Sequence, residues 1–333
     1  MIGIGIVGYG YWGPRLARNF DALGSAQVRA ICDQDESRLA VARRQFPHAL
    51  CLTEPEALLE DPQICAIAIA TPTASHYALA RACLRAGKHV LVEKPLAASS
   101  EQATALTREA KRQGKVLLVD HTWLFSGLLR ATRHTLATGA LGDVTHLHST
   151  RVGFGRFRTD VDVMWDLASH DLAIVDHLFQ DKPGSVQAVG YCRAGKPLCE
   201  LATLRLRWGD YRRAEIHVSW LSPKKVRRLQ IHGSRGTLNF DHDDARSRLY
   251  LDTSAAPERV DSAGRANREA AGSNPRELPF DRDEPLGHLV RHFVDCITEG
   301  EPPLADGIAA ARVIRWLEAA RSSMRSDGVE VAL

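Results

Sequence analysis

The sequence predicts an α/β protein, in which a doubly wound parallel sheet is followed by an α+β domain with a large, mostly antiparallel open sheet. A chain of 333 residues exceeds the usual size of one domain. Its first third alternates short apolar runs with segments of helical periodicity, as parallel βαβ units do. Later runs alternate apolar and polar residues with period two, which is typical of antiparallel strands with one covered face. We therefore expect two domains, 1–120 and 121–333.

The elements follow from these periodicities. Apolar runs such as 66–70 indicate strands that are covered on both faces. In the first domain we expect strands at 2–7, 28–32, 50–52, 65–70, 89–92 and 116–119, with helices that include 36–46, 76–86 and 100–113. In the second we expect strands at 144–152, 201–208 and 214–220, and helices at 128–138, 165–179, 286–299 and 307–324. The stretch 253–274 shows no period and is rich in small and polar residues, so we expect a mobile surface loop there.

The composition argues against several classes of protein. The formal charge of +3 is small and its basic residues are dispersed, which disfavours a dedicated nucleic-acid binder. No apolar run approaches the roughly 20 residues of a membrane span, and the N-terminal run resembles a buried strand more than a secretory signal. We expect a cytoplasmic protein.

The cysteines and histidines show no metal spacing. The seven cysteines are odd in number and include no Cys-x-x-Cys pair, and several, such as Cys65, lie in apolar runs. We interpret them as reduced core thiols, with neither a disulfide nor a metal framework. The histidines lack the His-Glu-x-x-His or Cys/His pattern of zinc sites, so no metal is expected.

A glycine-rich segment follows the first predicted strand and opens a helix. Gly8 permits a tight turn, Gly10 lets the backbone approach a pyrophosphate, and Gly13 allows close packing of helix on strand. The helix N-terminus supplies N–H groups and a partial positive charge to phosphates. This pattern predicts a Rossmann dinucleotide site, and its six residues are Gly8, Tyr9, Gly10, Tyr11, Trp12 and Gly13.

Two charged residues near the second strand bear on the choice of coenzyme. Asp33 ends that strand, where an acid typically accepts hydrogen bonds from ribose hydroxyls and repels a ribose phosphate, which favours NAD. Arg38 lies nearby and suits a ribose phosphate, so NADP is not excluded. Asp33 equally suits a helix cap.

Two further motifs suggest dehydrogenase chemistry. Glu93-Lys94-Pro95 follows a predicted strand of the parallel sheet, at the edge where ligands bind. In the helix at 165–179, Asp166 and His170 are spaced i, i+4 and share one face. Histidine is suited to remove a hydroxyl proton while a hydride leaves the carbinol carbon, and an ammonium can stabilise the developing alkoxide. Each motif alone has an ordinary reading, a solvated loop lysine or a surface Asp/His pair.

Taken in order, the motifs resemble those of the Gfo/Idh/MocA family of oxidoreductases over nearly the full length. The resemblance rests on Gly8–Gly13, Ala70-Thr71-Pro72 with His76, Ala86-Gly87-Lys88-His89-Val90 leading into Glu93-Lys94-Pro95, and Asp166-x-x-x-His170. It implies that Lys94 contacts substrate and nicotinamide ribose, that the Lys94–Pro95 peptide is cis, and that Asp166 and His170 bind and deprotonate a sugar hydroxyl. It further implies coenzyme contacts from Thr71, Pro72, Thr73, His76 and Glu93, and homodimers or homotetramers formed through the second sheet.

Within the family the chain resembles enzymes that oxidise the 3-hydroxyl of UDP-N-acetylglucosamine or its uronate. The similar segments are 8–14, 165–172 and 219–227, although Ser169 stands where that subgroup usually has proline. Trp165 opens the helical motif and is a candidate substrate residue. Arg151, Arg156 and Arg158 suit a diphosphate but equally an exposed loop. The alternatives are a dehydrogenase of a free sugar or inositol, and a non-catalytic dinucleotide sensor.

Overall fold

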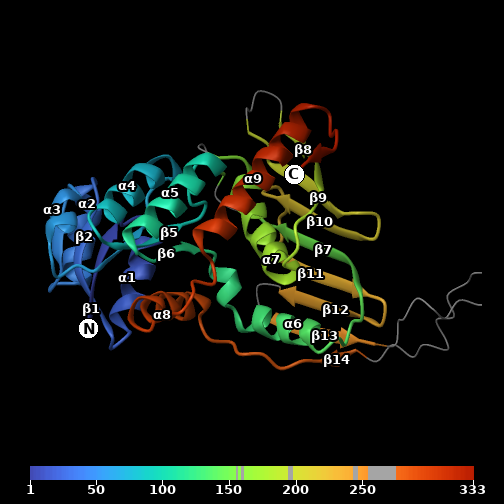
Figure 1. Cartoon of the computed structure of the whole chain (residues 1–333), viewed down its shortest axis with the longest axis horizontal. Coiled ribbons are helices and arrows are strands. Elements are labelled where there is room, and N and C mark those ends of the chain that lie inside the picture. Colours follow the sequence, from blue (N-terminus) through green and yellow to red (C-terminus); the bar gives the residue numbers. More distant parts are fainter. Residues whose placement is uncertain (155–156, 159–160, 194–197, 243–246, 254–274) are drawn as a thin grey trace, which may run out of the picture. The chain divides into compact units, whose positions relative to one another are not determined.

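The computed structural model describes residues 1–154, 157–158, 161–193, 198–242, 247–253 and 275–333. The chain forms two compact units (Figure 1). The first comprises Met1–Ser126 and Asp283–Arg315, and the second Gly127–Arg282 and Trp316–Leu333. The structure therefore differs from the expected domain 121–333, because residues 283–315 belong to the first unit. The loop expected at 253–274 lies, apart from Thr253, outside the described residues.

The first unit contains a six-stranded parallel sheet in the order β3-β2-β1-β4-β5-β6. Every residue of β1, β4 and β6 is buried, as expected for a sheet covered on both faces. The strands are β1 Ile2–Val7, β2 Ala26–Cys32, β3 Leu50–Leu52, β4 Ala66–Ile69, β5 His89–Glu93 and β6 Leu117–Asp120. The helices are α1 Gly13–Asp21, α2 Glu36–Gln45, α3 Glu56–Glu60, α4 Thr73–Arg85, α5 Ser100–Gln113 and the 3₁₀ turn η1 Thr122–Phe125.

The strand order places the candidate residues of this unit at one edge of the sheet. The chain runs outward from β1 in one direction through β2 and β3, and in the other through β4, β5 and β6. The carboxyl ends of β1 and β4 therefore flank the point where the topology switches, which is where open α/β sheets bind ligands. The glycine loop follows β1, residues 71–73 follow β4, and Lys94 follows β5.

The segment 283–315 adds a helix and a strand-like contact to the first unit. Helix α8, Pro285–Thr298, packs Phe293 against Phe20 of α1 with ring centroids 6.2 Å apart, and both rings are fully buried. Residues 305–306 then lie beside β6, where the Val119 N–H donates to the Ala305 carbonyl at 2.9 Å. The helix itself was predicted, but its amphipathic pattern does not reveal which sheet it covers. Helix α9, Gly307–Arg325, follows.

The described residues of the second unit form a nine-stranded sheet in the order β14-β13-β12-β11-β7-β10-β9-β8-β15. Its neighbours are antiparallel except β7 and β10, which run parallel. The strands are β7 Val144–Val152, β8 Ser185–Tyr191, β9 Leu201–Trp208, β10 Arg212–Ser219, β11 Val226–Gly233, β12 Gly236–His242, β13 Ser247–Asp252, β14 Arg276–Glu277 and β15 Val331–Ala332. The helices are α6 Gly127–Ala137, a π-helical turn Met164–Ala168 and α7 Ser169–Phe179.

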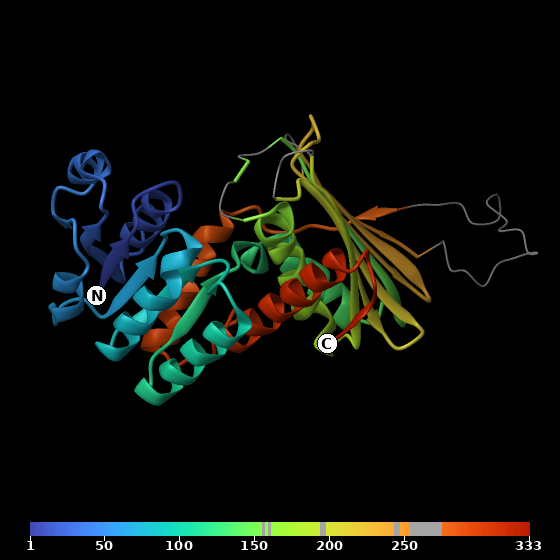
Figure 2. The ribbon, with the colours of Figure 1, turned by 90° about the horizontal axis from the view of Figure 1, so that it is seen from above.

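The two faces of this sheet differ in cover, as the period-two pattern predicted. On β7, Leu147, Ser149 and Arg151 are buried. Ser149 and Arg151 both bond Asp171 of α7, so α7 covers this face. The alternate residues of β7 are half-buried and lie on the opposite face, which carries no described helix (Figure 2). None of the described helices is both long and apolar enough to cross a bilayer.

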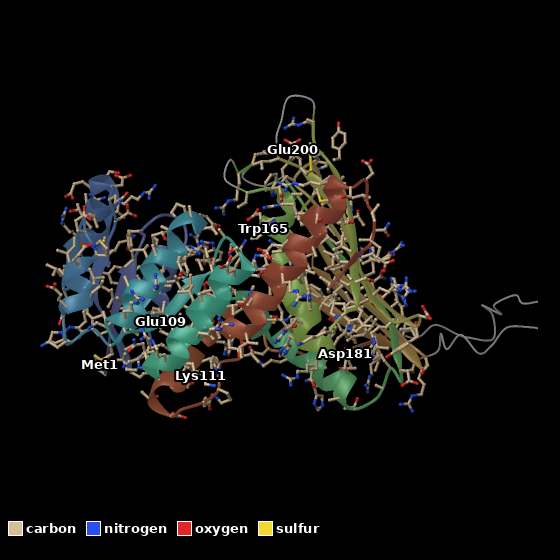
Figure 3. The ribbon with its side chains drawn as sticks, turned by 45° about the horizontal axis from the view of Figure 1, so that its top comes forward. Met1, Glu109, Lys111, Trp165, Asp181 and Glu200 are labelled. Carbon is tan, nitrogen blue, oxygen red and sulfur yellow. A yellow bond between two sulfur atoms is a disulfide. The ribbon has the colours of Figure 1, made fainter. Side chains whose placement is uncertain are left out.

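The cysteine prediction is wrong for three residues. Cys192 and Cys199 form a disulfide beside Glu200 (Figure 3), and Cys65 is exposed. Strands β8 and β9 are paired up to Tyr191 and Leu201, and the Glu200 N–H donates to the Tyr191 carbonyl at 2.9 Å. Cys192 and Cys199 lie just beyond this end of the pair and therefore face each other. Because β8 was not predicted, the sequence did not reveal this pairing. Cys32, Cys83 and Cys296 are buried thiols as expected, and Cys51 is partly exposed.

Candidate active site

The glycine loop after β1 has the backbone shape that the motif predicts. Gly8 has φ +94°, and a Cβ there would lie 2.7 Å from the Ala70 carbonyl oxygen. A Cβ on Gly13 would lie 2.0 Å from the Gly8 carbonyl oxygen, so helix α1 can only start this close to β1 with glycine at that position. A Cβ on Gly10 would meet nothing nearer than Arg38 Nη1 at 3.7 Å. The backbone at Gly10 is therefore open to a ligand.

The three aromatic residues of this loop separate into two groups. Tyr9 is buried, its hydroxyl donates to Gln45 Oε1 at 2.6 Å, and burial raises its pKa to about 12. Its side chain therefore anchors the loop to the fold and does not face the loop surface. Tyr11 is exposed, and Trp12 packs edge-on against it with centroids 5.5 Å apart. Of the three, Tyr11 and Trp12 remain candidates for contact with a coenzyme.

Asp33 is buried at the end of β2 and connects two loops. Its Oδ2 accepts the Tyr9 N–H at 2.6 Å and its Oδ1 accepts the Asp35 N–H at 2.9 Å. Arg38 Nη1 lies 3.3 Å from Asp33 Oδ2, and its guanidinium is half exposed. The helix cap of α2 is Asp35, whose side chain accepts the Ser37 N–H, so Asp33 is not the cap that the sequence left open. The carboxylate that favours NAD and the guanidinium that suits NADP therefore lie side by side after β2.

The loop after β4 is held by His76. One ring nitrogen lies 2.8 Å from the Thr71 carbonyl oxygen and the other 2.8 Å from that of Pro95, and the ring is buried. His76 therefore connects the loop of Thr71, Pro72 and Thr73 to the segment after β5. We expect it to position these loops, whereas Thr71, Pro72 and Thr73 keep some exposure. Lys88, which belongs to the segment 86–90 that the family resemblance also used, is buried too, and its ammonium donates to the Asp61 and Ile64 carbonyls.

Glu93 and Asp120 form a buried carboxyl pair at the ends of β5 and β6, where they are neighbours in register. Burial, followed by the negative charge of Asp120, raises the pKa of Glu93 well above its usual value. Glu93 Oε1 and Asp120 Oδ2 have no hydrogen-bond partner among the described residues. Because two neighbouring buried negative charges are unfavourable and the pKa of both groups is raised, we infer that the pair holds one proton and carries one negative charge.

That charge lies beside Lys94. The Lys94 N–H donates to Glu93 Oε2 at 3.2 Å, and the positive charge of Lys94 acts on both carboxyl groups. The Lys94–Pro95 peptide is cis, as the resemblance implied. His121 follows Asp120 in the chain. Its burial, and then the positive charge of Lys94, lower its pKa to about 3, so this imidazole is neutral. Lys94 therefore follows β5 at the carboxyl edge of the sheet, and the negative charge of the Glu93–Asp120 pair compensates its positive charge.

In the second unit, Asp166 and His170 belong to one helical segment, but its first turn is π-helical rather than α-helical. Between Asp162 and Val175 all residues are buried except Asp166, Leu167 and His170. The two candidate catalytic residues therefore emerge on the same side of an otherwise buried helix. Wide π turns of this kind often occur at functional sites.

Asp166 has neighbours that orient its carboxylate. The Trp220 indole N–H donates to Asp166 Oδ2 at 3.2 Å, and Arg158 Nη1 lies 3.8 Å from Asp166 Oδ1. Trp220 is buried and packs against Phe157, with ring centroids 5.8 Å apart. A fixed carboxylate four residues from a partly exposed imidazole can hold a hydroxyl group while the imidazole accepts its proton.

The other candidate substrate residues have different fates. Arg151 is buried and forms a two-point ion pair with Asp171, at 2.7 and 3.1 Å, so it is corrected from a phosphate ligand to a structural cation. Arg156 lies outside the described residues. Trp165, labelled in Figure 3, is buried. The guanidinium of Arg321 lies over its ring, and its indole N–H has no hydrogen-bond partner among the described residues. Arg158 is the described arginine of this group that remains partly exposed.

Sequence reasoning missed Asp120, His121 and the link between Trp220 and Asp166. Asp120 ends a strand of the parallel sheet, as Glu93 does, and His121 follows it, so this shared position was a usable signal. The bond from Trp220 to Asp166 joins residues 54 apart in the chain, and no local pattern predicts it.

Comparisons with known proteins now identify the family. A model described as "Oxidoreductase family, NAD-binding Rossmann fold" matches residues 2–121, and a "GFO/IDH/MocA C-terminal domain" model matches residues 129–239. The uncharacterized oxidoreductase YdgJ of Escherichia coli is 30% identical over 266 residues, covering 74% of each chain. The protein belongs to the Gfo/Idh/MocA family.

Two other family members have named substrates. The scyllo-inositol 2-dehydrogenase (NADP(+)) IolW of Bacillus subtilis is 30% identical over 249 residues, covering 70% of this chain and 66% of its own. The UDP-N-acetylglucosamine 3-dehydrogenase of Acidithiobacillus ferrooxidans is 26% identical over 324 residues, covering 93% of both chains. A solved structure of the latter, named GnnA, aligns with a TM-score of 0.83 at 24% identity, over 98% of this chain and 99% of that one, which supports the fold.

As a Gfo/Idh/MocA member the protein is an oxidoreductase of sugars or inositols that uses a nicotinamide dinucleotide. The first unit fits that coenzyme, because the backbone at Gly10 is open to a pyrophosphate and Asp33 lies at the end of β2. The residues that would hold the coenzyme are those of the glycine loop, Asp33 or Arg38, and the loop after β4.

The shared proton of Glu93 predicts a pH-dependent effect of Glu93→Gln. The folded protein raises the pKa of Glu93 above its ordinary value of 4.5, so it binds this proton where the unfolded chain has lost it. That contribution to stability is complete below about pH 4.5 and is lost as the pH rises toward the folded pKa. The amide of the variant keeps a donor toward Asp120 without titrating. Urea unfolding at pH 5, 6, 7 and 8 should show the free energy of unfolding of the variant rising relative to that of the wild type as the pH rises, by at most about 1.4 kcal/mol per pH unit for one proton. A difference that stays flat with pH would contradict the shared proton.

Proposed function

We propose that this protein catalyses NAD(P)-dependent oxidation of the 3-hydroxyl of a UDP-linked amino sugar, UDP-N-acetylglucosamine or its uronate, to a 3-keto sugar. The observation that carries the reaction type is the pairing of Asp166 and His170 on the exposed side of a buried helix. The named relative that matches 93% of both chains supports the substrate class.

The proposed roles follow from the surroundings of each residue. Asp166, held by the indole N–H of Trp220, binds the hydroxyl group, and His170 accepts its proton. For Lys94 we propose that its ammonium polarises a substrate hydroxyl and favours the alkoxide as the proton leaves. The bound coenzyme supplies the acceptor for the hydride of the carbinol carbon. The O–H proton and the C–H hydride leave together, and the carbinol becomes a ketone.

The diphosphate of a UDP-sugar requires a cation. Arg158 is partly exposed and lies 3.8 Å from Asp166, so we propose that it contacts the diphosphate. We also propose that the protein self-associates through the open sheet of the second unit, as the resemblance implies.

A second candidate is the oxidation of a free sugar or inositol, which the 30% identity to IolW favours. The two functions are separated by incubating purified protein with NAD or NADP and a panel of UDP-sugars, inositols and monosaccharides. We expect reduced coenzyme and a 3-keto product with UDP-N-acetylglucosamine or its uronate. Turnover of inositol or glucose without turnover of any UDP-sugar would replace the first proposal by the second.

The catalytic roles predict large losses of turnover. His170→Ala removes the base and should lower kcat by about 10²–10⁴-fold, and Lys94→Met should also lower kcat by removing the ammonium. The matched control is His177→Gln, which changes another half-buried histidine of α7 that contacts Arg133. Steady-state kinetics with the best substrate of the panel measure the effect. Unchanged turnover in both His170→Ala and Lys94→Met would refute the assigned roles.

The choice between NAD and NADP is tested at Arg38. We propose that NAD is preferred, because the carboxylate of Asp33 repels a ribose phosphate, and that NADP binding depends on Arg38. Arg38→Ala should therefore weaken NADP by about 10- to 100-fold, the loss expected for a hydrogen bond to a charged group. NAD should change far less. KM values for both coenzymes in the wild type and the variant give the answer, and equal losses for both would contradict a phosphate-specific role.

A further inference from the structure

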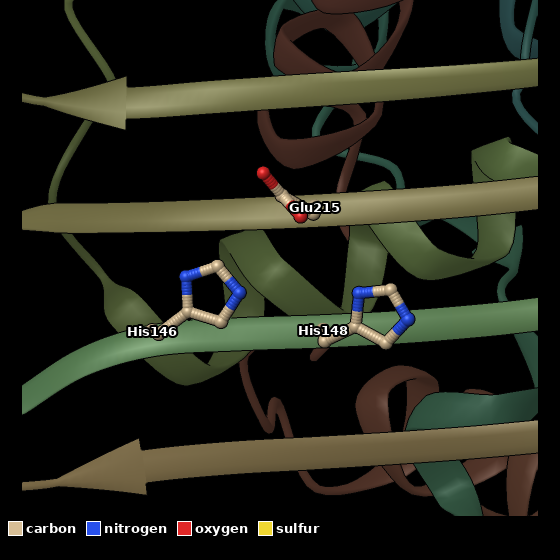
Figure 4. A group of neighbouring side chains, drawn as sticks. All are labelled: His146, His148 and Glu215. Atoms are coloured by element: carbon tan, nitrogen blue, oxygen red, sulfur yellow. The ribbon is translucent and has the colours of Figure 1, made fainter.

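The face of the second sheet opposite α7, through which we also propose self-association, carries a cluster of imidazole and carboxylate groups that has no role in the proposed oxidation. His146 and His148 are two residues apart on β7 and project from the same face. Glu215 on the neighbouring parallel strand β10 is the register partner of His148. Figure 4 shows the three side chains, with one ring nitrogen of His146 directed toward His148 and Glu215 above the space between the rings. One ligand atom from each residue lies within 4.8 Å of the others.

We propose that His146, His148 and Glu215 form a binding site for a divalent transition metal ion of the Zn²⁺ type. Two imidazoles and one carboxylate are an established ligand set for zinc, with water completing the coordination. Zinc–nitrogen bonds of about 2.0 Å in tetrahedral geometry place ligand atoms about 3.3 Å apart. The three atoms lie within 4.8 Å of one another, so metal binding requires them to approach by up to about 1.5 Å.

The neighbours of His148 favour one ligating nitrogen. Nε2 of His148 lies 3.2 Å from the Thr150 hydroxyl oxygen, which is on the same strand face. If Nε2–H donates to this oxygen, Nδ1 carries the lone pair that a metal requires. A histidine ligand whose second nitrogen is held in this way has a fixed tautomer and ring orientation. Thr150 is therefore a positioning residue for the site.

Arg205 competes with a metal ion for the carboxylate of Glu215. Arg205 contacts Glu215 Oε1 through Nε at 2.9 Å and Nη2 at 2.8 Å, and its side chain is about half exposed (53%). A metal ion replaces this exposed ion pair, which contributes little to stability.

The site is separate from the candidate catalytic residues of this unit. Helix α7, which carries His170, covers the opposite face of the sheet through the bonds of Asp171 to Ser149 and Arg151. The Ser149 and Arg151 side chains alternate along β7 with those of His146, His148 and Thr150. Occupation of one face can therefore be measured independently of turnover on the other.

The test measures metal binding by the full-length protein after treatment with a chelator. Isothermal titration with Zn²⁺, and the visible spectrum with Co²⁺, should show a saturable site on each chain and the intense absorption of a tetrahedral cobalt complex. His146→Ala, His148→Ala and Glu215→Gln should each weaken Zn²⁺ binding by at least about 100-fold. Thr150→Val should weaken it by about 10- to 100-fold, the usual effect of removing an orienting partner.

Two controls distinguish this site from unspecific binding by surface histidines. His48→Ala changes a partly exposed histidine of the first unit and should leave the Zn²⁺ affinity unchanged. Arg205→Gln removes the competing cation and should strengthen Zn²⁺ binding. Circular dichroism and coenzyme binding verify that each variant is folded. Equal Zn²⁺ affinity in the wild type and the three folded ligand variants, or absence of saturable binding by the wild type, would overturn the metal site without touching the proposed dehydrogenase activity.

Discussion

The burial of two neighbouring carboxyl groups, those of Glu93 and Asp120, constrains the charge at the carboxyl edge of the first sheet. The two carboxyl groups are neighbours on β5 and β6 and are withdrawn from water, so two negative charges there are strongly unfavourable. With one proton between them, a single charge remains beside Lys94, and the buried imidazole of His121 is neutral. The ammonium of Lys94 thus has one compensating charge near it. A fully ionised pair would bind that ammonium more strongly and reduce its capacity to stabilise a developing alkoxide.

In the second unit, a π-helical turn accompanies the exposure of two polar side chains on a buried helical segment. Asp162–Val175 is a buried segment that nevertheless presents Asp166 and His170 on one accessible side. The π turn at Met164–Ala168 occurs where Asp166 accepts the indole N–H of Trp220. Arg151 also supports this segment, because its ion pair with Asp171 joins α7 to β7. The candidate catalytic pair is therefore supported by Trp220 and by the buried Arg151, two residues that lie far apart in the sequence.

The part of this structure that the sequence predicts is the part determined by local patterns. The strand β1, the turn at Gly8 and the helix α5 appear with the predicted bounds or nearly so, because periodicity and backbone sterics act within a few residues. The return of α8 to the first unit, the disulfide between Cys192 and Cys199, and the burial of Arg151 depend on partners far along the chain. An arginine near a catalytic helix resembles a phosphate ligand until the structure shows that Asp171 already pairs with it.

The same distinction explains why the histidine cluster on the second sheet has no sequence signature. His146 and His148 alone are an ordinary alternation on a strand, and Glu215 is 67 residues beyond His148. The parallel pairing of β10 with β7, the one parallel contact among the described strands of that sheet, brings the carboxylate beside the two rings. Had β10 run antiparallel to β7, the loop lengths and the register would both differ. A metal site on this face would therefore be a property of the sheet topology, independent of the motifs that define the family.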